Sequence, residues 1–240
     1  MMVDYQKKEE DILVGLVKPQ GKRILEVGCG EGRASFMLAK YAEHYVAIDN
    51  DGNQINKANL RIPLELKNKI EFKVASATNI PLSGQSVDAV FMLLSFHEVS
   101  IQEQGAALVE SLRVLKSGGR IVIVDPEAYP VDSIMAICSA VHSKLKYFDH
   151  SVIVNHSKKV IEKVTREFDL KLNKEKYDVN WQFDDFNDLK NSVIADFPEI
   201  EWNDNKKIIL ADIIRGVVKD KEFLRPITIP DHMEVTVISK

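Results

Sequence analysis

The sequence predicts an α/β fold in which helices cover both faces of a doubly wound, mostly parallel sheet. Three observations predict it. Short apolar segments alternate with helical patterns over the first half of the chain, the connections between them are short, and a glycine-rich turn follows the first apolar segment. Such alternation forms parallel sheets with right-handed crossovers. The length of 240 residues is near the upper size of one hydrophobic core, so we expect a single domain with an elaboration.

Five buried strands are expected in the first half. Each is a run of aliphatic and β-branched residues bounded by polar or turn residues. The fourth run is apolar over nearly its whole length, which predicts a central strand covered on both faces. The expected ranges are 23–27, 45–48, 70–74, 87–94 and 121–124.

Helices are expected between these strands, because apolar residues recur there near helical spacing. The first contains residues 36–41, and a more polar helix begins near Asn53. A third covers residues 102–115, and the Ser-Gly-Gly segment 117–119 is expected to end it as a turn. A further helix is expected at the N-terminus, over residues 5–17.

The pattern changes after Pro126. Apolar residues at helical spacing predict added helices within residues 131–150 and 158–168, and another with Ile209 and Ile213 on its apolar stripe. We expect this added helical material to form a lid.

Two more strands are expected in the second half. One lies within residues 171–183, and residues 233–238 alternate polar and apolar side chains as in a strand with one solvated side. The acidic stretch 184–204 is interpreted as a solvated face. We therefore divide the single domain 1–240 into a ligand-binding half, 1–126, and a second half, 127–240, that completes the sheet.

Composition and charge exclude several classes of protein. The apolar fraction of 45% excludes a mainly disordered chain. A net charge of −4 shows no electrostatic footprint of a nucleic-acid or membrane-surface binder. Two cysteines cannot form a disulfide framework, the first residues show no apolar signal segment, and no apolar run reaches the roughly 20 residues of a membrane span. We expect a cytoplasmic protein with no nucleic-acid or membrane partner.

The most informative pattern is the glycine-rich turn after the first strand. Gly28, Gly30 and Gly32 alternate with other residues, so a ligand can approach bare backbone at the N-terminus of the next helix. Asp49 ends the second strand beside this turn, where a carboxylate can accept hydrogen bonds from ribose hydroxyls. Strand, turn, helix, second strand and terminal acid together predict a ligand that contains a nucleoside.

Two classes of ligand fit this geometry. A dinucleotide fingerprint needs a third glycine one place after Gly32, where the chain has Arg33. Glu26 lies inside the otherwise apolar first strand, and a buried carboxylate is costly unless it is paired. A ligand ammonium or a bridging basic side chain is its expected partner. The residues therefore favour a cationic ligand, and an NAD-dependent oxidoreductase is the weaker alternative.

These residues resemble the class I S-adenosylmethionine-dependent methyltransferases. Residues 25–33 are similar to the first motif of this family, and Asp49 is similar to its ribose-binding acid. Residues 77–82 and 87–90 are similar to the segment that leads into the family's fourth strand. Residues 112–120 are similar to the helix and turn that precede its fifth strand. The resemblance covers about the first half of the chain. It implies a Rossmann-like sheet, mostly parallel with an antiparallel C-terminal strand, and S-adenosyl-L-methionine as the cofactor.

The resemblance also implies which residues hold the methionine part of the cofactor. The backbone of Gly28, Cys29 and Gly30 would line it, and Glu26 would hold its amino group directly or through water. Tyr5, at the start of the N-terminal helix, is a further candidate for reaching the cofactor.

For the nucleoside, the resemblance implies that Asp49 takes the ribose hydroxyls and that Asn50 lies beside the adenine. Ser76 occupies the place where many members of the family have an aspartate that reads the adenine amino group, and Ala77 is adjacent. The serine hydroxyl or the backbone of Ala77 would serve instead.

The segment after the fourth strand would close the pocket. Leu94, Ser95 and Phe96 would surround the sulfonium. His97 follows at the edge of the sheet where open α/β folds bind ligands, so it is the candidate general base or acceptor-orienting group. An equally weighted alternative is that His97 caps the next helix or contacts the cofactor. Methyl transfer is an in-line displacement that often needs no base.

For the other candidate site residues, we favour a structural role over a functional one. Loop roles are favoured for Asp125, Glu127 and Tyr129, which could also face the acceptor. Three histidines match no metal-ligand spacing, so no metal site is expected; they are His142, His150 and His156. Five aromatic residues either pack in a core, which is favoured, or wall an acceptor pocket; they are Trp181, Phe183, Phe186, Phe197 and Trp202.

The predicted function is methyl transfer from S-adenosylmethionine to a small-molecule acceptor. The fourth strand ends in Ser95-Phe96-His97-Glu98, which lacks the Asn/Asp-Pro-Pro-aromatic signature of enzymes that methylate exocyclic nitrogens of bases or glutamine. The chain also lacks a Pro-Cys pair and a basic patch, so DNA and RNA are disfavoured as acceptors. A non-catalytic regulatory module that binds S-adenosylmethionine is the first alternative. The sequence does not indicate the oligomeric state.

Overall fold

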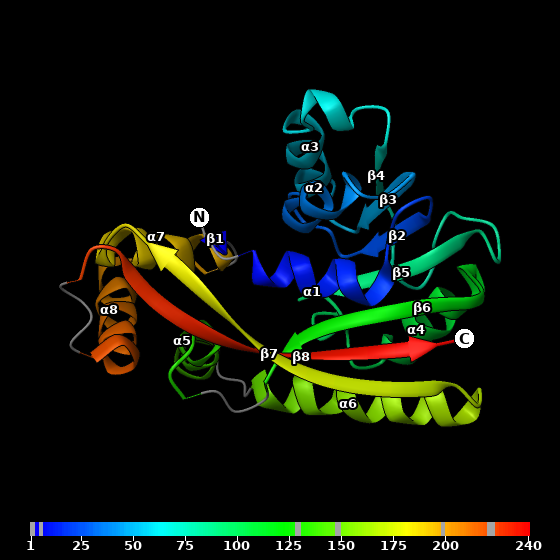
Figure 1. Cartoon of the computed structure of the whole chain (residues 1–240). Helices are drawn as coiled ribbons and strands as arrows, with labels where there is room; N and C mark the ends of the chain where they lie inside the picture. The colour runs from blue at the N-terminus through cyan, green and yellow to red at the C-terminus, as the bar shows by residue number, and fades with distance from the viewer. Residues whose placement is uncertain (1–2, 5–6, 128–130, 147–149, 198–199, 220–223) are drawn as a thin grey trace. The chain divides into compact units, whose positions relative to one another are not determined.

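The computed structural model describes every residue except 1–2, 5–6, 128–130, 147–149, 198–199 and 220–223 (Figure 1). The helices and strands follow in the order β1 Val3–Asp4, α1 Lys8–Val17, β2 Arg23–Val27, α2 Arg33–Ala39, β3 His44–Asp49, α3 Gly52–Leu60, η1 Leu64–Leu66, β4 Ile70–Val74, β5 Val87–Leu93, α4 Gln104–Val114, β6 Leu115–Pro126, α5 Ile134–Val141, η2 His142–Lys146, α6 His150–Glu167, β7 Lys171–Phe183, α7 Phe186–Asp196, α8 Asp204–Val218 and β8 Ile227–Ser239.

The described strands form one sheet in the order β1-β7-β8-β6-β5-β2-β3-β4. β2 pairs in parallel with β3 and β5, β3 with β4, and β5 with β6. β8 is antiparallel to β6, because Gly118 and Gly119 near the start of β6 bond to Lys240, directly after β8, while Glu127, directly after β6, bonds to His232 within β8. The two-residue β1, which the sequence did not predict, pairs antiparallel with β7. The predicted fold class, a mostly parallel sheet with an antiparallel C-terminal strand, is confirmed.

The chain divides into two compact units. Unit 1 comprises residues 1–9, 126–154 and 176–233, and unit 2 comprises residues 10–125, 155–175 and 234–240. Unit 2 therefore contains the glycine-rich turn and also takes residues from the second half of the chain.

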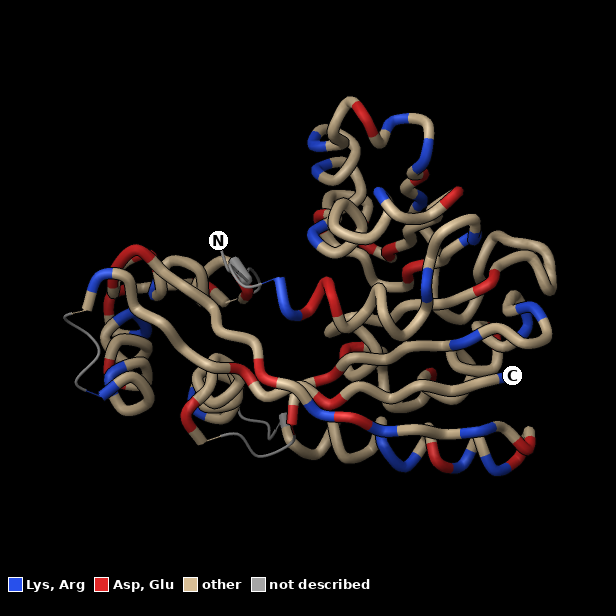
Figure 2. Tube along the Cα trace, in the orientation of Figure 1, with Lys and Arg blue, Asp and Glu red and all other residues tan. Residues whose placement is uncertain are grey.

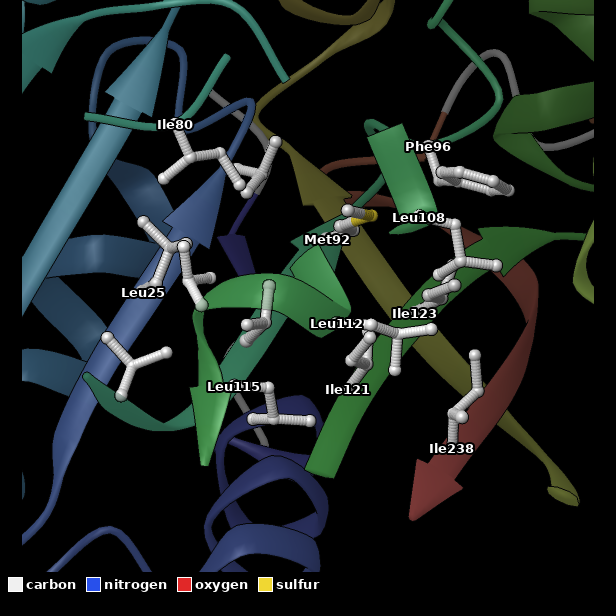
Figure 3. Packing of buried hydrophobic residues seen from close by; sticks show 14 of the residues in the cluster. Leu25, Ile80, Met92, Phe96, Leu108, Leu112, Leu115, Ile121, Ile123 and Ile238 are labelled. Atoms are coloured by element: carbon white, nitrogen blue, oxygen red, sulfur yellow. The ribbon is translucent and has the colours of Figure 1, made fainter. Parts of the chain in front are cut away.

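Side chains of unit 2 alternate between the two faces of its sheet, as the strand period of two requires. One face carries Leu25 and Val27 of β2, which belong to a buried cluster with residues of α4 and α6 (Figure 3). On β2, Glu26 has the opposite orientation and accepts a hydrogen bond from Ser35 of α2. Helices thus cover both faces of this part of the sheet, and its strands are buried as predicted. The labelled members of the cluster are Leu25, Ile80, Met92, Phe96, Leu108, Leu112, Leu115, Ile121, Ile123 and Ile238.

The predicted turn at residues 117–119 is wrong, because this segment belongs to β6. Val87 of β5 pairs with Leu115, whereas Ala89 pairs with Arg120, so residues 116–119 form a bulge in β6. Gly118 has φ of 76° there, and its N–H donates to the carbonyl of Lys240. The glycines thus allow a bulge rather than a helix-ending turn.

Unit 1 has its own core. α8 packs against α5 and α7, and the buried faces of these helices include Ile137, Val193 and Ile213. Trp181 of β7 is 1% exposed, and its indole N–H donates to the buried carboxylate of Asp231. The aromatic residues Trp181, Phe183 and Phe197 are buried, while Phe186 and Trp202 are half-buried.

Charged residues are interspersed on the surface rather than gathered by sign along α6 and the first residues of β7 (Figure 2). Lys174 pairs with Glu162 there at 2.9 Å. Within the described residues, no helix combines the length and the apolar character needed to cross a bilayer.

Candidate functional site

A cavity of about 590 Å³ lies in unit 2 at the carboxyl ends of β2, β3, β4 and β5. This is the edge at which open α/β sheets bind ligands. It brings together nine of the twelve predicted site residues, which are Gly28, Gly30, Asp49, Asn50, Ser76, Ala77, Leu94, Ser95 and Phe96. The other three, Glu26, Cys29 and His97, are not among the residues that line it.

The glycine-rich turn is held by hydrogen bonds from its own N–H groups. The N–H groups of Gly28 and Cys29 donate to the carbonyl of Ile48, at 2.8 and 3.0 Å. The N–H of Gly32 donates to the carbonyl of Cys29. Gly30 donates its N–H to Asp49. These N–H groups shape the turn and are therefore not free to bind a phosphate.

Position 28 needs a glycine because Ser95 lies too close to leave room for a side chain. Its φ is 78°, and a Cβ on this residue would lie 2.4 Å from the Cβ of Ser95. Ser95 itself is fixed, because its hydroxyl donates to the carbonyl of Val27 at 2.6 Å. Leu94, with φ of 55°, turns the chain after β5 into this contact. At Gly30, by contrast, a Cβ would meet nothing within 4 Å, so open space adjoins its backbone.

Gly28→Ala is expected to lower the free energy of unfolding by about 2 kcal/mol or more, because the left-handed backbone and the clash with Ser95 add. Gly30→Ala is the matched control, since its φ of 51° is also left-handed but its Cβ meets no atom. It should cost about 1 kcal/mol. Urea denaturation of both variants measures the difference; equal losses would contradict the packing argument.

Asp49 accepts hydrogen bonds that hold the cavity wall, and its carboxylate can still accept further hydrogen bonds from a ligand. One carboxylate oxygen accepts the N–H of Gly30 at 2.8 Å, and the other accepts the N–H of Asp51 at 2.9 Å. A carboxylate oxygen can accept more than one hydrogen bond, so each retains capacity for a further donor. Two adjacent hydroxyls, as on a ribose, match this arrangement.

Glu26 is buried behind the turn, at 1% exposure. One of its carboxylate oxygens accepts hydrogen bonds from the hydroxyls of Ser35, at 2.5 Å, and Tyr45, at 3.0 Å. Burial and the adjacent charge of Glu26 raise the pKa of Tyr45 well above its usual value, so this hydroxyl remains a donor. These contacts join β2, α2 and β3. The predicted role of Glu26 in holding a ligand amino group remains a prediction.

Cys29 lies in the turn at 6% exposure and does not line the cavity. Burial raises the pKa of its thiol far above the usual value, and the charges of Glu26 and Asp49 raise it further. The thiolate is the reactive form of cysteine, so this geometry gives Cys29 a packing role rather than a nucleophilic one. Its predicted backbone contact with a ligand remains untested.

His97 is buried beside the cavity between two carboxylates. Its Nδ1 lies 2.7 Å from Asp125, and its Nε2 lies 3.1 Å from Glu98. Burial lowers the pKa of His97, but the charge of Asp125 and the hydrogen bonds to both carboxylates outweigh burial and raise the pKa to about 10. A pKa raised in this direction favours the protonated ring, which would donate from both nitrogens. The geometry supports an orienting role, through Glu98, rather than a general base.

The other described candidates are not among the residues that line this cavity. Glu127 pairs with Lys176 at 2.7 Å in unit 1, as expected of a structural loop residue. The ring of His142 contacts that of Phe197, and His156 bonds to Gln104. Tyr5, Tyr129 and the side chain of His150 lie outside the described residues. No group of three or more described His, Cys, Asp or Glu side chains is placed to hold a metal.

Several lining residues were not predicted from the sequence. They include Asp51, Gln54, Glu98, Ser100 and Glu103. Asp51 caps α3 by accepting the N–H of Asn53, and Ser100 donates its hydroxyl to Glu103 at the start of α4. The Asp-Gly-Asn and Ser-x-x-Glu patterns are helix-start signals that could have placed these residues next to the strand ends. Gln54 has no such signal.

The cavity is acidic. Four carboxylates line it, from Asp49, Asp51, Glu98 and Glu103, and within the described part of the chain no lysine, arginine or histidine does. The excess of carboxylates over basic side chains in this lining favours a positively charged ligand.

Comparison with known proteins agrees with the geometry. Residues 25–123 match the family model described as a methyltransferase domain. Over 111 residues the chain is 38% identical to demethylmenaquinone methyltransferase of Clavibacter sepedonicus, a match that covers 46% of this chain and 44% of that protein. These matches support the predicted resemblance of this region to the class I S-adenosylmethionine-dependent methyltransferases.

Another curated relative is similar over about the same part of the chain. The S-adenosyl-L-methionine-dependent Diels-Alderase iccD of Talaromyces variabilis is 31% identical over 132 residues, which are 52% of this chain and 43% of that protein. The chain thus matches less than half of the length of these two curated relatives.

Solved structures show the same fold over most of the chain. A crystal structure of a Bacillus halodurans C-125 protein has a TM-score of 0.67 at 18% identity and covers 97% of this chain and 98% of that one. An S-adenosylmethionine-dependent methyltransferase from Aquifex aeolicus has a TM-score of 0.56 at 21% identity, with coverage of 73% and 88%. The chain therefore shares the Rossmann-like fold of these proteins.

Proposed function

We propose that this protein transfers the methyl group of S-adenosylmethionine to a small-molecule acceptor. The acidic cavity at the carboxyl ends of β2 to β5 carries the proposal. The cofactor has a sulfonium and an ammonium charge, and carboxylates compensate positive charges that lose water on binding. When bound, S-adenosylmethionine supplies a methyl group made electrophilic by the sulfonium.

The residues that line the cavity fit this cofactor. Asp49 has acceptor capacity for two ribose hydroxyls, and the open space beside the backbone of Gly30 can take the methionine chain. The part of the cavity proposed for the nucleoside is also lined by Asn50, Ser76 and Ala77. Under the proposal Leu94, Ser95 and Phe96 exclude water from the sulfonium end, which protects an in-line displacement.

The rival dinucleotide is disfavoured on two grounds. A pyrophosphate needs unpaired backbone N–H groups or basic side chains. In the glycine-rich turn, the N–H groups of Gly28, Cys29, Gly30 and Gly32 already have acceptors, and no basic side chain lines the described cavity. The two negative charges of a pyrophosphate would also face the carboxylates.

The small-molecule acceptor is supported by the relatives and by the site. Demethylmenaquinone and 27-O-demethylrifamycin SV, which appear in the names of two relatives, are small molecules. Under the proposal His97, held between Asp125 and Glu98, orients Glu98 rather than removing a proton from the acceptor, in keeping with its raised pKa. Glu98 and Glu103, which line the cavity, are the acidic groups that an acceptor would meet. The expected cytoplasmic location remains a prediction.

A regulatory module that binds the cofactor without transferring its methyl group is the second candidate. The family match ends at residue 123, so the region expected to bind an acceptor lies outside it. A cofactor-bound protein that forms no S-adenosylhomocysteine with any acceptor would have this role.

Calorimetry with S-adenosylmethionine, S-adenosylhomocysteine and NAD tests the cofactor. We expect both sulfur nucleosides to bind and NAD to show no heat; binding of NAD alone would exclude the proposal. Incubation with S-adenosylmethionine and fractionated small metabolites then tests transfer, with S-adenosylhomocysteine and a metabolite heavier by one methyl group detected by mass spectrometry. Failure of every fraction would favour the regulatory module.

A further inference from the structure

The wall of the cavity that follows β5 is a segment without a helix or a strand. Residues 94–103 connect β5 to α4, and most of them line the cavity. Hydrogen bonds of Ser95 to Val27 and of His97 to Asp125 hold the first part of this segment to the sheet. The second part lies beyond these bonds, so a different contact fixes its position.

Gln104, the first residue of α4, makes that contact. Its side chain is fully buried, and its Nε2 donates to the carbonyl of Val99, which lines the cavity, at 3.2 Å. The same nitrogen donates to the hydroxyl of Ser157 in α6 at 2.9 Å. The amide oxygen Oε1 lies 2.9 Å from Nδ1 of His156, also in α6. One buried amide therefore joins the cavity wall to α6.

The partners of Gln104 fix the orientation of its amide. The carbonyl of Val99 can only accept, so the amide nitrogen faces it and the amide oxygen faces His156. His156 must then donate from Nδ1. Reversing the amide would place two acceptors against each other at Val99. The network therefore has defined donors and acceptors.

Packing alone does not account for a polar residue at position 104. One helical turn further along each helix, Leu108 of α4 and Ile161 of α6 belong to the buried apolar cluster. An aliphatic side chain at position 104 would extend this cluster without the desolvation that a buried amide has to offset. The amide supplies what an aliphatic side chain lacks, which is the hydrogen bond to the carbonyl of Val99.

We propose that Gln104 is a positioning residue for methyl transfer, because it holds the part of the cavity wall around Val99 against α6. This inference rests on the proposed function, which gives the wall a ligand to enclose. Methyl transfer needs a ligand that is held in one geometry and shielded from water. A wall released from α6 would open more often, so a bound ligand would leave the cavity faster.

Gln104→Met tests the proposal, because it removes the amide and keeps the length of the side chain. Hydrogen–deuterium exchange without ligand, measured by mass spectrometry, should be about tenfold faster than in the wild type over residues 98–103. The glycine-rich turn, residues 28–32, should keep its wild-type exchange, since its N–H groups bond elsewhere. Stopped-flow displacement should show S-adenosylhomocysteine dissociating about fivefold faster.

Ser111→Ala is the matched control, because Ser111 is also buried on α4 but donates its hydroxyl to Ala107 within the same helix. Both rates should stay within about twofold of the wild type. Unchanged rates in Gln104→Met, an equal increase in Ser111→Ala, or faster exchange that extends equally to the glycine-rich turn would overturn the inference. Failure of the wild-type protein to bind S-adenosylhomocysteine would remove the proposed function, whereas the exchange of residues 98–103 would still test the contact.

A measurement on the wild-type protein covers the case in which Gln104→Met does not fold. NMR of the histidine ring nitrogens should find the hydrogen of the neutral His156 ring on Nδ1. A neutral ring with its hydrogen on Nε2 would require the reversed amide, without the bond to Val99, and would overturn the inference.

Discussion

Asp49→Asn is expected to weaken the binding of S-adenosylhomocysteine about 100-fold, which corresponds to about 3 kcal/mol. An asparagine has a single side-chain oxygen, so it cannot accept from Gly30 and Asp51 together and also bind two hydroxyls. The amide NH₂ would face one of these N–H groups as a second donor. Titration calorimetry of the wild-type protein and the variant measures the change.

Asp88→Asn provides the control for Asp49→Asn. Asp88 lies at the amino end of β5, outside the cavity, where it pairs with Lys116 at 2.9 Å. Asp88→Asn should leave the affinity for S-adenosylhomocysteine within about twofold of the wild type. A half-exposed ion pair contributes about a few tenths of a kcal/mol, and this pair lies outside the cavity. If both variants lost affinity equally, the specific role of Asp49 would be lost.

Asp125→Asn is expected to destabilise the protein by about 3 kcal/mol near neutral pH, because it leaves the buried His97 without its charged partner. His97 has a folded pKa raised to about 10 from an ordinary value of 6.5. A raised pKa means that the folded state binds the proton more tightly. The stabilisation is therefore complete below the ordinary pKa and decreases as pH rises towards the folded pKa.

Urea denaturation at pH 6.5, 8 and 10 tests this dependence on Asp125. The difference between wild type and Asp125→Asn should shrink steadily across this series. Glu162→Gln is the control, because Glu162 forms only an exposed pair with Lys174. It should cost less than about 1 kcal/mol at every pH. A constant difference for Asp125→Asn would show that His97 is neutral in the folded protein.

The parts of the site that could be predicted from sequence are those built by neighbouring residues. Gly28 and Gly30 come just after the end of β2, and Asp49 is the last residue of β3. Because parallel strands place their carboxyl ends at one edge, local order along the chain is enough to bring these residues together. Leu94 and Ser95, which the family resemblance assigned to the pocket, follow the end of β5 and line the cavity.

The partners of buried polar groups could not be predicted in this way. The residue type and position of Glu26 indicated a buried acid, but its contacts with Ser35 and Tyr45 depend on how α2 and β3 pack against β2. The pairing of His97 with Asp125 arises from the lateral contact of β5 and β6, which brings together residues 28 positions apart. A linear pattern carries no signal for such lateral contacts.

The bulge at 116–119 illustrates a different difficulty. Ser-Gly-Gly is a turn signal in the sequence, and glycine does adopt a left-handed conformation at Gly118. Whether this conformation ends a helix or interrupts a strand depends on what pairs beside it. Here Lys240 provides the pairing, from a strand far along the chain.

The interleaving of the two units has a consequence for biosynthesis. The chain passes between the units at residues 9–10, 125–126, 154–155, 175–176 and 233–234, so neither unit is a continuous stretch of sequence. The buried cluster of unit 2 includes Ile161, Val164 and Ile238, all of them translated after the glycine-rich turn and the whole of β2 to β6. A nascent chain that has emerged only as far as residue 126 therefore lacks part of this buried cluster. The hydrophobic core of unit 2 is complete only after Ile238 has been synthesised.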